Sequence, residues 1–233
     1  MAYIEFKDVN KIYKTSKMEL KVLNNVNFKI EKGEIIVITG PSKSGKTTCL
    51  NILSGMDNLL SGSVFFDGTK INDLNSRKLT KYRRENIGFI FKEDNLLKNL
   101  TVKENIEIST DICKDKLNID SLMKKMNLYK KKDNLPCELS NFDKKKVSVL
   151  RAIAKKPKLL LCDEPTNGFD SKEKKQMLNL IKDIAKKEKM TVIIATKDNS
   201  ILPIANKIIK IKNGNIMSVK VNKKPASVGE LKW

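Results

Sequence analysis

One eight-residue motif constrains this chain more than any other feature of its sequence. Residues 40–47 read Gly-Pro-Ser-Lys-Ser-Gly-Lys-Thr and match the pattern G-x-x-x-x-G-K-S/T. An apolar segment of strand length, residues 34–39, precedes the motif, and a helical pattern over residues 45–54 follows it. Because the motif wraps phosphate groups when it stands between a strand and a helix, the segment predicts a nucleotide-binding loop.

The residues of this loop have different expected roles toward a triphosphate. Its backbone N–H groups and the positive end of the following helix attract phosphate. Lys46 can reach the β- and γ-phosphates, the Thr47 hydroxyl can ligate Mg²⁺, and Thr48 can add a contact. For Lys43, a side chain in solvent is favoured over a contact with nucleotide. The expected binding residues here are Gly40, Pro41, Ser42, Lys43, Ser44, Gly45, Lys46, Thr47 and Thr48.

Hydrophobic periodicity predicts an α/β fold with a mainly parallel, doubly wound sheet, because strands alternate with helices along the chain. We expect a mostly helical middle at residues 101–154 and a long amphipathic helix at 171–189. The tail after Val219 has little apolar periodicity and is expected to be loose. The expected strands cover residues 3–6, 22–30, 34–39, 63–66, 86–91, 158–162, 191–196 and 207–211.

Two carboxylates end one of the buried strands. The run from Leu159 to Cys162 is apolar, and Asp163 and Glu164 follow it. Ligands of a parallel sheet sit at the carboxyl ends of its strands, so both acids are expected beside the phosphate loop. Asp163 is the expected Mg²⁺ ligand, and Glu164 stands where a base can polarise an attacking water.

Composition limits the remaining classes of function. The chain has 233 residues and a net charge of +20, with no histidine and four scattered cysteines, so we expect neither a zinc site nor a disulfide framework. No apolar run approaches the roughly 20 residues of a spanning helix, and the N-terminus does not resemble an export signal, so a cytoplasmic location is expected. The lysine runs 130–132 and 144–146 are expected to be solvated.

The two phosphate-site motifs, in this order, resemble those of the ATP-binding cassette ATPases over nearly the whole chain. Tyr13 matches an aromatic residue that stacks on adenine, residues 87–91 resemble the strand before the glutamine loop, and residues 163–170 resemble the second Walker motif and the loop after it. Residues 95–97 and 100–105 resemble the branch of macrolide export, lipoprotein release and antimicrobial-peptide resistance, with the cell-division cassette close to it.

The resemblance implies a fold, cofactors and partners. It implies one α/β nucleotide-binding domain over 1–233, a P-loop NTPase (RecA-like) with an N-terminal antiparallel β subdomain. Residues 1–91 and 155–233 would form the core, and 92–154 an inserted helical subdomain that docks a membrane permease subunit. ATP and Mg²⁺ are the implied ligands. The chain would sit peripherally at the inner face of the cell membrane, as a nucleotide-dependent homodimer or heterodimer closed head to tail.

Three family positions are altered in this chain. Lys92 replaces the glutamine that senses Mg²⁺, and Lys197 replaces the histidine after the fifth strand. The signature Leu-Ser-Gly-Gly-Gln becomes residues 139–143, Leu-Ser-Asn-Phe-Asp, which keep Ser140 as the expected contact with nucleotide. Phe142 is expected to obstruct backbone approach to the γ-phosphate, and Asp143 to add negative charge there.

Two main interpretations of these changes stay open. In one, Lys46 and Lys197 stabilise the γ-phosphate charge and Glu164 orients water, so the chain is an ATPase of reduced rate that powers a transporter. In the other, it is a regulatory half of a cassette pair that binds ATP with little or no hydrolysis. A remote third, a nucleic-acid-associated cassette, is suggested by the charge alone, and no nucleic acid partner is expected.

Overall fold

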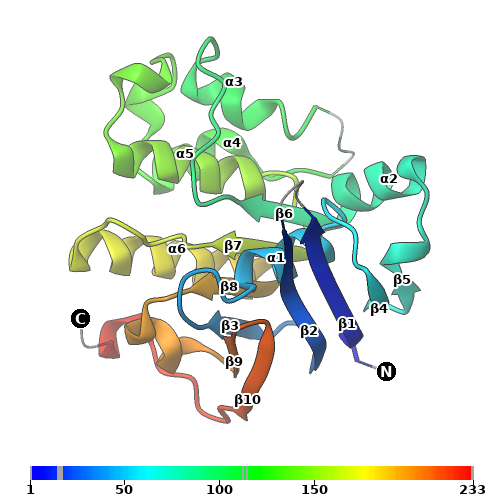
Figure 1. The fold of residues 1–233 in the computed structure, drawn as a ribbon. Helices are drawn as coiled ribbons and strands as arrows, with labels where there is room; N and C mark the ends of the chain where they lie inside the picture. Colours follow the sequence, from blue (N-terminus) through cyan, green and yellow to red (C-terminus); the bar gives the residue numbers. More distant parts are fainter. Residues whose placement is uncertain (1, 15–17, 112, 114, 232–233) are drawn as a thin grey trace.

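The computed structural model describes residues 2–14, 18–111, 113 and 115–231, and its strands form two sheets (Figure 1). The larger sheet has the order β10-β9-β3-β8-β7-β6, and all its neighbouring pairs are parallel except β10 with β9. This confirms the predicted mainly parallel sheet. Its strands are β3 (Ile35–Thr39), β6 (Ile87–Ile90), β7 (Leu159–Asp163), β8 (Thr191–Thr196), β9 (Lys207–Lys212) and β10 (Asn215–Val221).

The smaller sheet is antiparallel, with the order β2-β1-β4-β5. In its first strand Ile4 and Phe6 are buried while Lys7 is exposed, as expected of a sheet that covers a core with one face. The strands are β1 (Ile4–Lys14), β2 (Glu19–Ile30), β4 (Ser61–Phe66) and β5 (Thr69–Lys70). The predicted N-terminal antiparallel β subdomain is therefore confirmed as a sheet.

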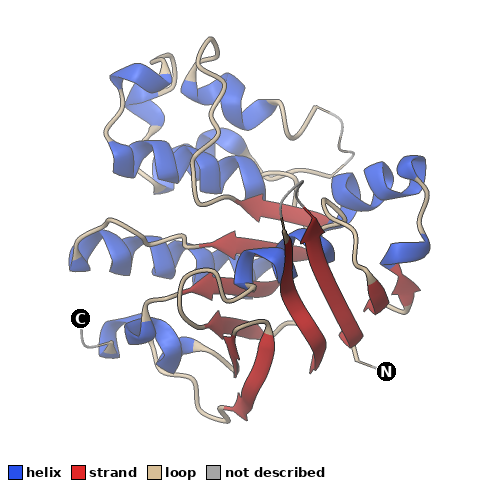
Figure 2. Cartoon of the chain, in the orientation of Figure 1, coloured by secondary structure: helices blue, strands red, loops and turns tan. Residues whose placement is uncertain are grey.

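The helices of the middle of the chain gather together beside β6 (Figure 2). They are α3 (Val102–Glu107), α4 (Ile119–Lys125) and α5 (Asn141–Ile153). The other helices are α1 (Lys46–Leu53), α2 (Ser76–Asn86) and α6 (Ser171–Glu188). Side chains of Ser140 and Asp170 cap the starts of α5 and α6, because each accepts a hydrogen bond from a backbone N–H of the first turn.

Two hydrophobic cores lie on opposite faces of the parallel sheet. Alternate residues of one strand enter different cores: Val37 packs in the core that includes α5 and α6, whereas Ile36 and Ile38 pack in the core shared with α1 and the antiparallel sheet. Because both faces are covered, the strands β7 and β8 are buried throughout, so a site on this sheet must lie at the ends of its strands.

One expectation about the chain is wrong. The tail after Val219 is not loose, since β10 continues to Val221 and a short 3₁₀ turn follows at Val228–Glu230. Val228 and Leu231 are buried, and both belong to the core that includes α6. Two isolated apolar residues have no period that a sequence reading can detect, yet they suffice to anchor the segment. The division into 1–91 with 155–233 and 92–154 stays a prediction.

Candidate functional site

The phosphate loop joins the end of β3 to the start of α1. Gly45 takes a left-handed backbone with φ of +106°, and a Cβ there would lie 2.7 Å from Leu23 Cδ2, so only glycine fits. Lys43 also has a positive φ, +62°, and its side chain is exposed, in agreement with the expected solvent-pointing conformation. The loop therefore has the curled backbone that its sequence predicts.

Unused hydrogen-bonding capacity in the loop fits a bound phosphate chain. The Lys46 ammonium donates to the carbonyl oxygens of Gly40 and Pro41, both at 2.8 Å, and burial lowers its pKa. The Ser44 hydroxyl is buried and has no hydrogen-bond partner among the described residues. A buried polar group without a partner costs free energy, so a ligand that supplied an acceptor here would be stabilised.

The two predicted metal ligands, Thr47 and Asp163, lie within hydrogen-bond distance of each other. The Thr47 hydroxyl lies 2.9 Å and 3.1 Å from the two carboxylate oxygens of Asp163, which ends β7. Burial raises the pKa of Asp163, and the negative charge of Glu164 adds to that rise, while the hydrogen bond from Thr47 opposes it. A hydroxyl and a carboxylate at this spacing are a suitable protein share of a Mg²⁺ site that also includes phosphate oxygens.

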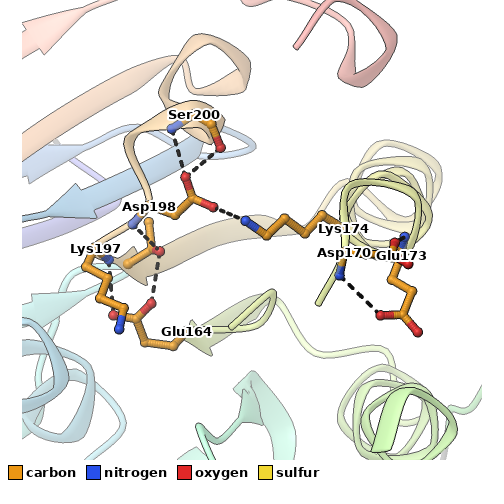
Figure 3. A network of polar contacts seen from close by, with 8 residues as sticks. Glu164, Asp170, Glu173, Lys174, Lys197, Asp198 and Ser200 are labelled. Carbon is orange, nitrogen blue, oxygen red and sulfur yellow. Dashed lines mark hydrogen bonds and ion pairs between the residues drawn. The ribbon is translucent and has the colours of Figure 1, made fainter. Parts of the chain in front are cut away.

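Glu164 follows β7, and its side chain is held by residues at the carboxyl end of β8 (Figure 3). Its carboxylate accepts hydrogen bonds from the Thr196 hydroxyl at 3.0 Å and from the backbone N–H of Lys197 at 3.1 Å. The Glu164 backbone is left-handed, with φ of +48°, which is an unfavourable conformation for this residue type. The side chain of Lys197 is exposed.

A supporting network beside Glu164 was not anticipated from the sequence. Asp198 accepts hydrogen bonds from the backbone N–H and the hydroxyl of Ser200, at 2.9 Å and 2.5 Å, and pairs with Lys174 of α6 at 2.7 Å (Figure 3). The Asp198 backbone N–H in turn donates to Thr196, which contacts Glu164. The short spacing from Asp198 to Ser200 indicates a capped turn, but nothing in the sequence points to Lys174.

Tyr13 lies near the end of β1. It is 38% exposed, its hydroxyl donates to Asp57 at 2.5 Å, and the Lys11 ammonium lies 4.7 Å from the centre of its ring. Its hydroxyl also interacts with Thr48. Stacking of adenine on this ring stays a prediction. Asp57, which positions the ring, was not recognised in the sequence.

The altered signature corrects one expectation about charge. Ser140 and Asp143 face each other, because the Ser140 hydroxyl accepts from the Asp143 backbone N–H at 3.1 Å. Asp143 is 7% exposed, and its carboxylate pairs with Lys131 at 2.5 Å and with Lys146. The expectation that Asp143 adds negative charge toward nucleotide is therefore wrong, since two ammonium groups neutralise it within the chain.

Phe142 packs inward rather than standing free. Its ring meets that of Phe169 edge to face, with centres 5.2 Å apart and planes at 81°, and the Lys146 ammonium lies 4.9 Å from its centre. Phe169 belongs to the loop after Glu164, so the contact joins two segments of the site. Obstruction of the γ-phosphate by Phe142 stays a prediction.

The expectation of a solvated lysine run at 144–146 is also wrong in part. Lys145 is buried, and its ammonium donates to the carbonyl oxygens of Phe91 and Lys92 at 3.1 Å and 2.9 Å. The same ammonium lies 2.7 Å from Asp94 Oδ1 as an ion pair. Lys146 is buried as well, against Asp143. Lys145 is expected on the surface because its partners lie more than fifty residues earlier in the sequence, whereas Lys146 pairs with Asp143 only three residues before it.

The fold and the site together define the class of protein. A parallel sheet that ends in a glycine-rich loop and a threonine–aspartate pair is the arrangement of a P-loop nucleotide-binding protein. A family model described as ABC transporter matches residues 23–167, which is more than half of the chain. The chain therefore belongs to the ABC transporter family, and the resemblance seen in its motifs is confirmed.

Relatives of known name agree with this assignment. A putative ABC transporter ATP-binding protein of Mycoplasma genitalium is 41% identical and covers 99% of this chain, which spans 50% of that protein. The bacitracin export ATP-binding protein BceA of Halalkalibacterium halodurans is 36% identical, with 93% of this chain and 87% of that protein covered. The chain thus spans about half the length of the first curated relatives it matches.

Solved structures show the same fold. The ATP-binding cassette MJ0796 of Methanocaldococcus jannaschii, in a dimeric post-hydrolysis state with ADP and Pi, matches with a TM-score of 0.86. It is 32% identical, and the match covers 94% of this chain and 98% of that one.

In the part of the chain that the structure describes, no helix is both apolar enough and long enough to cross a membrane.

Proposed function

We propose that this chain binds ATP with Mg²⁺ at the loop of residues 40–48 and hydrolyses it to drive a separately encoded membrane permease. The observation that carries the proposal is the convergence of Lys46, Thr47, Asp163 and Glu164 at one edge of the parallel sheet. Thr47 and Asp163 would hold Mg²⁺, which supplies charge neutralisation to the phosphates when bound. Tyr13 would stack on the adenine.

In the proposed mechanism the chain positions charge and one water molecule. Glu164, tethered by Thr196 and the Lys197 backbone N–H, accepts a hydrogen bond from the attacking water and draws its proton. Lys46 and the Lys197 ammonium stabilise the negative charge that develops on the γ-phosphate oxygens. Phosphate and ADP are the products, and Glu164 returns its proton to solvent.

Dimer closure would couple this chemistry to transport. The α5 start with Ser140 would meet the ATP of a second cassette, identical or not, and residues 92–154 would dock the permease at the inner face of the membrane. ATP moves the equilibrium toward the closed dimer by its higher affinity for that state. The printed names of relatives, bacitracin export and macrolide export, support an export or peptide-handling role.

A second candidate is a regulatory cassette that binds ATP without turning it over. It is favoured by the altered positions Lys92, Phe142 and Lys197. Removing one positioned acid/base or charge-stabilising group typically costs about 10²–10⁴-fold in rate, so several such losses can silence hydrolysis.

Phosphate release by the purified chain separates the two candidates. We expect release from Mg-ATP that rises with protein concentration and is lost in Glu164→Gln, while ATP still raises the thermal midpoint of that variant. Lys46→Ala should lose the ATP-dependent rise, and Lys220→Ala, an exposed position on β10, serves as the matched control. ATP stabilisation without any phosphate would favour the regulatory cassette, and unchanged stabilisation of Lys46→Ala would refute the site.

A further inference from the structure

Both oxygens of the Glu164 carboxylate are held by the end of β8 and the residue after it. The Thr196 hydroxyl donates to Oε2 at 3.0 Å, and the Lys197 backbone N–H donates to Oε1 at 3.1 Å. The Thr196 hydroxyl also accepts a hydrogen bond from the Asp198 backbone N–H at 3.0 Å. Because a hydroxyl has a single proton, this second bond leaves the proton of Thr196 directed at Glu164. The orientation of Glu164 therefore depends on the backbone conformation of residues 196–198.

The side chain of Asp198 holds this backbone through both of its carboxylate oxygens. Oδ1 accepts hydrogen bonds from the backbone N–H and the hydroxyl of Ser200, so Asp198 caps the 3₁₀ turn at Asn199–Ile204. Oδ2 accepts a hydrogen bond from the Lys174 ammonium, which reaches across from α6 at 2.7 Å (Figure 3). Both side chains of this ion pair are 24% exposed, so the charge-assisted bond is partly shielded from water and stronger than one between neutral groups.

Another hydrogen bond joins the capped turn to the strand before the phosphate loop. The Thr39 hydroxyl donates to Asn199 Oδ1 at 3.0 Å, and Thr39 is the last residue of β3. In the parallel register of β3 and β8, Thr39 pairs with Thr196, so the ends of the two strands are level. Residues 198–200 are thus tied to α6 and to β3 at once. These contacts fix Glu164 relative to the loop that is proposed to hold the phosphates.

We propose that Lys174 and Asp198 are positioning residues for ATP hydrolysis, because their ion pair sets the backbone of residues 196–198 that orients Glu164 toward the attacking water. The inference rests on the proposed function and deepens it by assigning a role outside the phosphate loop. The role is separate from helix capping, since the cap uses Oδ1 of Asp198 and the ion pair uses Oδ2. Each carboxylate oxygen of Glu164 accepts more than one hydrogen bond, so the two tethers leave it able to bind water.

Steady-state phosphate release from Mg-ATP by the unaltered chain and by Lys174→Met tests this role. A shift of about 1 Å at a reacting group can cost about 100-fold in rate, and the other bonds of the turn remain, so we expect kcat to fall by about tenfold. KM should change by less than about twofold, because Lys174 lies outside the nucleotide site. Lys174→Arg keeps the charge and the donors and should recover most of the rate.

Lys182→Met is the matched control, because it removes an ammonium from the same helix that donates to the Ala226 carbonyl oxygen at 2.7 Å. It should leave kcat unchanged. Asp198→Asn is the second variant, since asparagine can still cap the turn but loses the charge that pairs with Lys174, and it should lower kcat as Lys174→Met does.

Thr196→Val removes the hydroxyl that links Asp198 to Glu164 and should also lower kcat. Adding Lys174→Met to Thr196→Val should slow release by less than about a further threefold, because both changes act through one carboxylate. Losses that multiply in full, a kcat of Lys174→Met equal to that of Lys182→Met, or a loss confined to KM would overturn the inference alone. No phosphate release by the unaltered chain would overturn the proposed hydrolysis and this inference with it.

Discussion

The substitution Asp143→Asn tests whether the ion-pair cluster at the start of α5 stabilises the fold. The Asp143 carboxylate pairs with the Lys146 ammonium, whose side chain is 10% exposed, and with Lys131, whose side chain is 45% exposed. Asparagine keeps the shape of the side chain but removes its charge. The buried ammonium of Lys146 is then left with the Met126 carbonyl at 3.3 Å and the neutral amide.

The buried ion pair between Asp143 and Lys146 determines how large a loss in the free energy of unfolding we expect. Breaking a buried ion pair by removing one partner costs about 3–5 kcal/mol, whereas a half-exposed pair contributes about 0–1 kcal/mol. Because the amide oxygen and the Met126 carbonyl still accept hydrogen bonds from Lys146, we expect a loss of about 2–3 kcal/mol in the free energy of unfolding. In a chain of this length that lowers the midpoint of thermal unfolding by roughly 4–12 °C.

Urea unfolding followed by circular dichroism measures this loss. A double-mutant cycle with Lys146→Met should give a coupling energy of about 1–2 kcal/mol, since the two side chains are in contact. Glu19→Gln is the matched control, because its pair with Lys14 is exposed on both sides, and it should change stability by less than about 0.5 kcal/mol. The reasoning is refuted if Asp143→Asn unfolds at the control midpoint or if the coupling is zero.

The remaining predictions concern pH, packing and turnover. Burial opposes ionisation of Asp143, but hydrogen bonds from Lys131 and Lys146 outweigh burial and lower the pKa of this carboxyl. The ionised carboxylate therefore contributes its full stabilisation of the fold above the unfolded-state pKa, and this contribution is lost as the pH falls through the lower, folded-state pKa. Acid should therefore reduce urea resistance less in Asp143→Asn than in the unaltered chain. Gly88→Ala should cost about 1–3 kcal/mol, because its Cβ would lie 2.6 Å from the Ala152 carbonyl oxygen; an unchanged thermal midpoint would contradict this. Lys197→His should raise phosphate release if the altered position limits turnover, and equal rates would count against that limit.

The central part of the fold and site could be predicted because its signals are local. The loop of residues 40–47 carries its own glycines, and the strands at 159–163 and 191–196 are continuous apolar runs bounded by polar residues. Asp163 was expected beside the loop because it stands at the carboxyl end of a strand in a parallel sheet, and the structure brings it to Thr47. In such segments local preference and tertiary packing favour the same structure.

The rest depends on partners far along the chain. Lys145 and Lys146 read as surface charges because burying an unpaired ammonium is costly, and only the fold shows that they are paired. The acceptors of Lys145 lie more than fifty residues earlier, at Phe91 and Lys92. One partner of Asp143, Lys131, precedes it by 12 residues and lies in another turn. The other partner, Lys146, is only three residues later on the same helix, so that pair was a local signal that was not recognised in the sequence.

The buried ammonium of Lys145 makes two segments of the chain move as one piece. Its stem belongs to α5, and its two carbonyl acceptors and the paired Asp94 carboxylate belong to the stretch just after β6. Separating them would strip hydrogen bonds from a charge that water cannot quickly reach, so a tilt of α5 drags the strand end with it. A displacement of α5 is thus transmitted to the carboxyl end of β6 directly through the contacts of Lys145. It does not have to pass along the chain between residues 92 and 145.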